Sequence, residues 1–109
     1  MIKHYNKLVR DNIPAIIKKT GNKPIYKQLK KKQDILLALD DKLVEEVFEY
    51  LQADTDAEKA FELVDIIDVV EEILKVRKYD IVNLIKQKRK TNGAFSKHLF
   101  LEDVEGKDE

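Results

Sequence analysis

Two stretches of apolar side chains at helical spacing, separated by a short polar turn, constrain the fold of this chain more than any other feature. Over residues 34–53, and again from Glu58 to about Lys78, apolar side chains recur at intervals of three and four, which predicts two long helices. Because only a short turn at 54–57 lies between them, we expect the helices to pack antiparallel. The apolar positions are Leu36, Leu37, Leu39, Leu43, Val44, Val47, Phe48, Tyr50 and Leu51 in the first helix, and Leu63, Ile66, Ile67, Val70, Ile73 and Leu74 in the second.

Capping signals mark the ends of these helices. Asp34 is expected to cap the first long helix, and Thr55 with Glu58 forms the T-x-x-E pattern of a capping box that opens the second. Asp80 is expected to cap a third helix over 81–90.

Weaker signals lie nearer the chain ends. Asn92 and Gly93 are expected to end the third helix. Pro14 suits the first turn of a short helix that Gly21 can close, and residues 25–29 could form a short strand.

The composition favours one all-α domain. The chain has 109 residues with only three Gly and two Pro, while 39% of its residues are charged and 43% are hydrophobic. We expect a basic N-terminal segment over 1–33, a helical core over 34–90 and a C-terminal segment over 91–109. Because two paired helices cover only one face of each other, we expect a homodimer or homotetramer to complete an antiparallel helical bundle.

Several classes of protein are excluded or disfavoured. The lack of cysteine excludes disulfides and thiolate-bound metals. No apolar run approaches the roughly 18 residues that a membrane span needs, and the first residues have no apolar core for a signal peptide. We therefore expect a cytoplasmic protein that does not bind a membrane. The lysine-rich stretch 27–32 has no interleaved aromatic residues and the centre of the chain is acidic, which argues against nucleic acid as a partner.

The zero net charge conceals a strong sorting of charge along the chain. Residues 1–33 carry a net charge of +9, residues 34–74 carry −12, residues 75–98 carry +7 and residues 99–109 carry −4. Such blocks are expected to meet one another or ligands of opposite charge. A metal ion held by the acidic block and a polyphosphate held by the basic ones would satisfy both. Solvated helix faces that neutralise one another are the alternative.

Two acidic pairs stand at the edges of the predicted apolar faces. Glu46 and Glu49 form an E-x-x-E pair on the first long helix, and Glu62 and Asp65 form an E-x-x-D pair on the second. Residues three apart project from successive turns on one side of a helix, so antiparallel packing can bring the two pairs face to face. Four converging carboxylates repel one another unless a cation joins them, and hard oxygen ligands suit Mg²⁺ or Mn²⁺.

Ion pairing of these acids with the many lysines is the alternative to a metal site. Asp68, one turn beyond Asp65, could be a further ligand or a surface acid. Glu45 points farther from the apolar face and is expected to be an outer or surface group.

The strings KLVEEVFEYLQA and FELVDIIDVV, which hold the two acidic pairs, resemble the MazG-like all-α nucleotide pyrophosphohydrolases. The opening YNKLVRDNIP and the closing KRKTNGAFSKHLFLE resemble the phosphoribosyl-ATP pyrophosphohydrolase-like subgroup of that superfamily, so the similarity spans nearly the whole chain. At 92–95 this chain has Asn-Gly-Ala-Phe where the subgroup often has Arg-Gly-Gly-Phe.

The resemblance implies a Mg²⁺-dependent hydrolase that cleaves the bond between the α and β phosphates of a nucleotide. The products would be a monophosphate and pyrophosphate, and the substrate would be a nucleoside triphosphate or a nucleotide like phosphoribosyl-ATP. Carried over by position, the metal ligands are Glu46, Glu49, Glu62 and Asp65.

The chemistry of this reaction adds further expectations. Cleavage of a phosphoanhydride needs neutralised phosphate oxygens and a base that takes a proton from water. For the phosphates we expect Lys7, Arg10 and Lys88, and for the base Glu46 or Glu49. A non-catalytic helical interaction module, in which carboxylates pair with lysines across an oligomer interface, is the alternative function.

Overall fold

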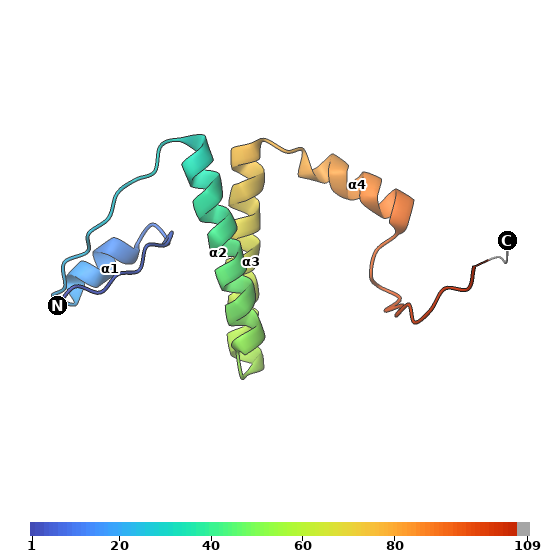
Figure 1. Ribbon diagram of the computed structural model, residues 1–109, viewed down its shortest axis with the longest axis horizontal. Coiled ribbons are helices and arrows are strands. Elements are labelled where there is room, and N and C mark those ends of the chain that lie inside the picture. Colours follow the sequence, from blue (N-terminus) through green and yellow to red (C-terminus); the bar gives the residue numbers. More distant parts are fainter. Residues whose placement is uncertain (107–109) are drawn as a thin grey trace. The chain divides into compact units, whose positions relative to one another are not determined.

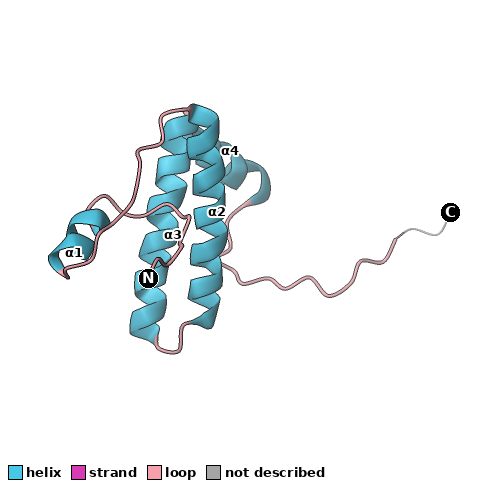
Figure 2. Ribbon diagram, turned by 60° about the vertical axis from the view of Figure 1, so that its left-hand side comes forward, coloured by secondary structure: helices cyan, strands magenta, loops and turns pink. Residues whose placement is uncertain are grey.

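The computed structural model describes residues 1–106, which form helices and loops without a strand (Figure 1, Figure 2). The prediction of an all-α chain is therefore confirmed, whereas the possible strand at 25–29 is wrong, since these residues belong to no helix or strand. The helices are α1 (Ile13–Lys19), α2 (Lys32–Gln52), α3 (Asp56–Arg77) and α4 (Ile81–Asn92). They belong to two units: the first covers Met1–Tyr79, and the second begins at Asp80.

In the first unit, α2 and α3 pack side by side along their length and run antiparallel, as predicted (Figure 1). Residues 53–55 connect them. Beside this turn the Lys59 ammonium donates a hydrogen bond of 2.9 Å to the backbone carbonyl of Tyr50, which ties the first turn of α3 to the last turn of α2. The same ammonium lies 4.7 Å from the centre of the Tyr50 ring.

The capping box of α3 is confirmed. The Thr55 hydroxyl accepts a hydrogen bond of 3.1 Å from the backbone N–H of Glu58, and the Glu58 carboxylate accepts one of 3.2 Å from the N–H of Asp54. The first contact satisfies an N–H group that the helix start would leave without a partner, and the second ties the residue before the cap to the first turn of α3.

The predicted cap of α2 is wrong. The helix begins at Lys32, its N-cap is Lys31 with no side-chain hydrogen bond, and Asp34 lies within the first turn. Lysine and glutamine favour helix, so the two residues before Asp34 extend α2 beyond the expected start. At its actual position the Asp34 carboxylate interacts favourably with the positive end of the helix dipole.

The second unit contains α4, which Asp80 caps as predicted. The Asp80 carboxylate accepts a hydrogen bond of 3.3 Å from the backbone N–H of Asn83. The helix continues through Asn92, slightly past the predicted end, and Gly93 follows it with a φ of +82°. This positive φ suits glycine and ends the helix.

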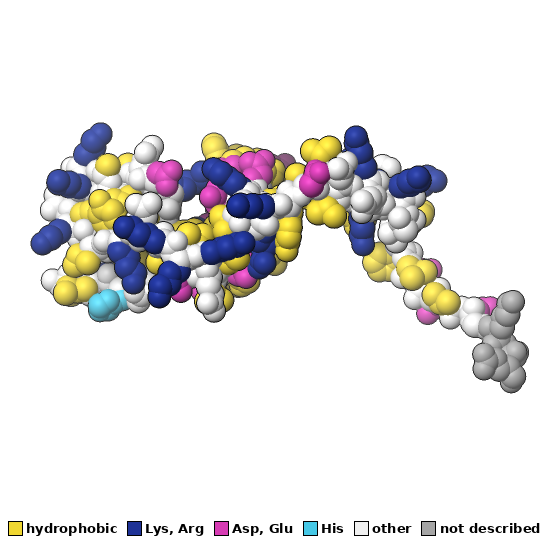
Figure 3. Space-filling model, turned by 90° about the horizontal axis from the view of Figure 1, so that it is seen from above, with side chains coloured by type: hydrophobic (Ala, Val, Ile, Leu, Met, Phe, Trp, Pro, Cys, Tyr) yellow, Lys and Arg dark blue, Asp and Glu magenta, His cyan; other side chains and the backbone are white. Residues whose placement is uncertain are grey.

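The α2–α3 pair buries few side chains. Among the described residues, Leu39 is the one buried hydrophobic residue and Glu46 the one buried charged residue. Leu37, Val44, Phe48 and Leu51 are each more than half exposed, and apolar side chains lie open at the surface among charged ones (Figure 3). Their spacing of seven, four and three residues places them along one side of α2. This helix therefore has two apolar faces, of which α3 covers one.

Candidate metal and phosphate site

The structure brings the predicted acidic pairs together between α2 and α3. Oxygens of Glu46, Glu62 and Asp65 all lie within 4.8 Å of one another, and so do oxygens of Glu45, Glu46 and Glu49. Glu46 belongs to both groups and joins them. We call these five residues the acidic cluster. The antiparallel packing of α2 on α3 places each i,i+3 pair opposite the other, so the pairs meet although 12 residues separate them in the sequence.

Two oxygens at the centre of this cluster lack partners. Glu46 is only 5% exposed, and its Oε2 atom and the Oε2 atom of Glu62 are both shielded from solvent without a hydrogen-bond donor. A buried carboxylate oxygen without a donor or cation is unfavourable. A small divalent cation would satisfy both atoms, and the donor set of carboxylate oxygens is the one that Mg²⁺ and Mn²⁺ prefer. The residues present therefore fit such an ion.

Burial and neighbouring negative charges raise the pKa of two carboxyl groups in the cluster. Partial burial, followed by the negative charges of Glu46 and Glu62, raises the pKa of Glu49 above its usual value. Loss of solvent also raises the pKa of Glu62, and the carboxylates of Glu46 and Asp65 act in the same direction. Both shifts mean that loss of solvent, with the neighbouring negative charges added, disfavours the ionised form of these two carboxyl groups.

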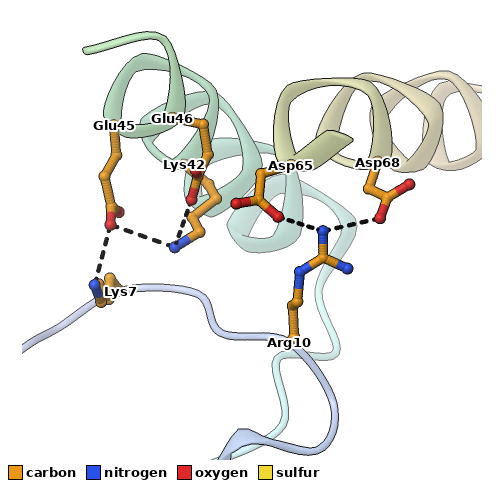
Figure 4. Close-up of polar contacts among 7 residues, drawn as sticks. All are labelled: Lys7, Arg10, Lys42, Glu45, Glu46, Asp65 and Asp68. Carbon is orange, nitrogen blue, oxygen red and sulfur yellow. Dashed lines mark hydrogen bonds and ion pairs between the residues drawn. The ribbon is translucent and has the colours of Figure 1, made fainter. Parts of the chain in front are cut away.

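Two lysines neutralise part of the negative charge at the end of the cluster on α2. The Lys42 ammonium lies 3.2 Å from Glu46 and 3.3 Å from Glu45, and the Lys7 ammonium lies 3.0 Å from Glu45 (Figure 4). Partial burial raises the pKa of Glu45, but the hydrogen bond from Lys7 and the charge of Lys42 outweigh it, so that this pKa is lowered overall. The hydrogen bond to Glu45 in turn raises the pKa of Lys7.

Arg10 neutralises part of the negative charge at the end of the cluster on α3. One guanidinium nitrogen of Arg10 lies 2.6 Å from an oxygen of Asp65 and 2.9 Å from an oxygen of Asp68 (Figure 4). Lys7 and Arg10 both come from the N-terminal segment, which these ion pairs join to α2 and to α3. Two of the three residues predicted to bind phosphate therefore lie at the rim of the acidic cluster. The third, Lys88, is exposed on α4 in the second unit and remains a sequence-based prediction.

No protein-family model, curated protein or solved structure matches this chain.

Two contacts of the site were missed from the sequence. Lys42 was not singled out, although its spacing of four residues from Glu46 on one helix is a signal for an ion pair. Glu45 was expected to be an outer or surface group, whereas it is half-buried and accepts hydrogen bonds from both Lys7 and Lys42. The pairing with Lys7 joins residues 38 positions apart and left no signal in the local spacing.

Taken together, the site has a negatively charged centre and a positively charged rim. The centre offers closely spaced oxygen ligands, and the rim offers an ammonium and a guanidinium, both of which bind phosphate oxygens. Within residues 1–106, none of the helices combines the length and apolarity needed to cross a bilayer.

Proposed function

We propose that this chain is a Mg²⁺-dependent nucleotide pyrophosphohydrolase, with Mn²⁺ as a substitute ion. The observation that carries the proposal is the pair of buried, unpartnered carboxylate oxygens on Glu46 of α2 and Glu62 of α3, two residues that share one group of converging oxygens. A solvated acidic surface has no reason to bury such atoms, whereas a divalent cation gives them a partner. The resemblance of the acidic motifs to the MazG-like hydrolases supports the same reaction.

In this proposal different residues bind the metal ion, the attacking water and the phosphates. Glu46, Glu62 and Asp65 would hold the ion, and Glu49 would either complete the ligand set on the side of α2 or act as the base. When bound, Mg²⁺ supplies positive charge that neutralises phosphate oxygens and makes phosphorus open to attack. Lys7 and Arg10 bind the negative charge of the departing pyrophosphate, and Lys88 of the second unit stays a phosphate ligand predicted from the sequence alone.

The reaction itself is a hydrolysis. The oxygen of a water molecule forms a bond to the α phosphorus while the bond from that phosphorus to the α–β bridging oxygen breaks. The electron pair of the broken bond leaves with pyrophosphate, and a nucleoside monophosphate remains. A carboxylate takes the proton of the water; we favour Glu49 over Glu46, because Glu46 belongs to both groups of the cluster.

The proposal includes assembly with further copies of the chain as a homodimer or homotetramer. Val44 is 71% exposed and Phe48 is 62% exposed, and both lie on the side of α2 that α3 leaves open. A helix pair with a single buried apolar side chain has too little core for a stable fold, and a second copy supplies a matching apolar face.

A non-catalytic helical interaction module is the second candidate. The ion pairs of Lys7, Lys42 and Arg10 favour it, because these cations already neutralise part of the acidic cluster without any metal. The two candidates differ in their response to metal. A true site raises the melting temperature as Mg²⁺ or Mn²⁺ binds the folded state, whereas ion pairs do not.

The test combines Glu62→Gln with a matched control, Glu72→Gln, which removes an exposed carboxylate from the same helix. Release of pyrophosphate from a panel of nucleoside triphosphates and phosphoribosyl-ATP is measured with Mg²⁺ and with chelator. We expect Glu62→Gln to lower the rate by at least about a hundredfold and to abolish the thermal shift with Mn²⁺, since one ligand loses its charge. Glu72→Gln should retain both.

Normal hydrolysis by Glu62→Gln would refute the assignment of the metal site. Absence of pyrophosphate release across the panel, together with no thermal shift from either metal, would favour the interaction module.

A further inference from the structure

Arg10 binds two carboxylates of α3 that differ in their surroundings. Asp65 lies within the acidic cluster, close to Glu46 and Glu62, whereas Asp68 lies one turn further along α3 and belongs to neither group of converging oxygens. The same guanidinium nitrogen contacts both, at 2.6 Å and 2.9 Å (Figure 4). One partner of Arg10 is therefore a proposed metal ligand, and the other is not.

These two contacts respond differently when a divalent cation binds. The cation and the Arg10 guanidinium compete for the Asp65 oxygen, and positive charge at the cluster repels the guanidinium. The Arg10 and Asp65 side chains are 55% and 33% exposed, so water weakens their ion pair and the cation can displace it. Asp68 keeps its negative charge and its position on α3 during this exchange.

We propose that Asp68 is a positioning residue that keeps Arg10 beside the site after a divalent cation has taken Asp65. Held by Asp68 alone, the guanidinium has donors free for a phosphate oxygen of the substrate. The inference rests on the proposed function and gives it an order, in which the cation binds first and releases Arg10 for the nucleotide. Linkage requires that the cation in turn lowers the affinity of Arg10 for Asp65.

The attachment of the N-terminal segment supports this role. The described ion pairs join this segment to the α2–α3 pair through Lys7 at Glu45 and through Arg10 at Asp65 and Asp68. Glu45 also holds Lys42, so Lys7 shares its partner with a second cation. Without Asp68, cation binding would leave the segment with the Lys7 contact alone.

Exchange of the Arg10 side-chain N–H with water measures the anchoring directly. Protein labelled with ¹⁵N-arginine contains only three arginines, and the signal of Arg10 is the one that Arg10→Lys removes. Exchange rates are measured by NMR with chelator and with saturating Mg²⁺ in the wild type, Asp68→Asn, Asp68→Glu and Glu72→Gln. Arg77 on α3 serves as the internal reference.

In the wild type we expect slow exchange in both conditions. In Asp68→Asn we expect slow exchange with chelator, because Asp65 still holds the guanidinium, and exchange about fivefold faster with Mg²⁺. Asp68→Glu should restore slow exchange, and the control Glu72→Gln should behave as the wild type does. The KM for a nucleoside triphosphate should rise by a similar factor in Asp68→Asn, with kcat little changed.

Suppose that calorimetry shows Mg²⁺ binding to the wild type. The inference is then overturned, while the proposed function stands, if the Arg10 N–H of Asp68→Asn and of the wild type exchange at the same rate with saturating Mg²⁺, whether that rate is slow or fast. If calorimetry shows no binding of Mg²⁺ to the wild type, the proposed function fails, and the inference fails with it.

Discussion

At the scale of the residue, the buried charge of Glu46 depends most on Lys42. The Lys42 ammonium lies 3.2 Å from Glu46, and only 14% of its side chain and 6% of the Glu46 side chain are exposed. Loss of one partner from such a pair leaves a buried charge uncompensated. We expect Lys42→Met to lower the free energy of unfolding by roughly 2–3 kcal/mol in the presence of chelator.

Metal distinguishes this loss from a general packing defect. Saturating Mn²⁺ should restore most of the stability of Lys42→Met, because the ion neutralises the same carboxylate. The measurement is urea denaturation with chelator and with Mn²⁺, and Lys75→Met, at an exposed position on α3, is the control. An equal loss with and without Mn²⁺ would mean that the Lys42 stem matters for packing rather than for charge.

Some contacts of the site could be predicted from the sequence and others could not. The convergence of Glu46 with Glu62 and Asp65 followed from helical spacing and a short connection, because both are local properties of the chain. The contacts of Arg10 with Asp65 and Asp68 span more than 50 residues and depend on the path of an irregular segment. No periodic pattern encodes that path, so the sequence did not predict the carboxylate partners of Arg10, and the phosphate-binding role that it gave to Arg10 stays a prediction.

At the scale of the element, the helix starts differ in how their caps work. The Thr55 hydroxyl accepts a hydrogen bond at the start of α3, whereas Asp34 lies inside α2 and makes no capping hydrogen bond. We expect Thr55→Ala to destabilise the protein by about 1 kcal/mol and Asp34→Ala by only a few tenths. Urea denaturation of both variants checks the order, with Thr55→Ser, which keeps the hydroxyl acceptor, as the control. A larger effect of Asp34→Ala would restore that residue as the functional cap.

The same comparison explains which element boundaries could be predicted. At α3 and α4 a capping residue stands directly before the helix, so the sequence marks the start. At α2 a lysine-rich stretch runs into the helix, and a suitable cap further along the sequence misled the prediction. Helix propensity in that stretch decided the start, and Asp34 gained its favourable interaction from the helix dipole instead.

At the scale of the whole molecule, both sides of α2 are apolar, and α3 covers one of them within the first unit. The sequence predicted this surplus because two paired helices cover only one face of each other. It could not predict which residues remain open, since that depends on how α2 is rotated against α3. In the structure Leu39 faces inward and is buried, while Leu37, Val44 and Phe48 are exposed.

This open face leads to the prediction for the assembly. Phe48→Lys places a charge in the proposed contact between copies, where burial without a partner is costly. We expect it to shift the protein from oligomer to monomer in analytical ultracentrifugation and to lower the melting temperature, because folding and assembly are coupled in a chain with so small a core. Phe48→Leu keeps the face apolar and should preserve the oligomer. If the wild type sediments as a monomer, there is no contact between copies. If Phe48→Lys leaves the oligomer unchanged, the contact between copies lies elsewhere on the chain.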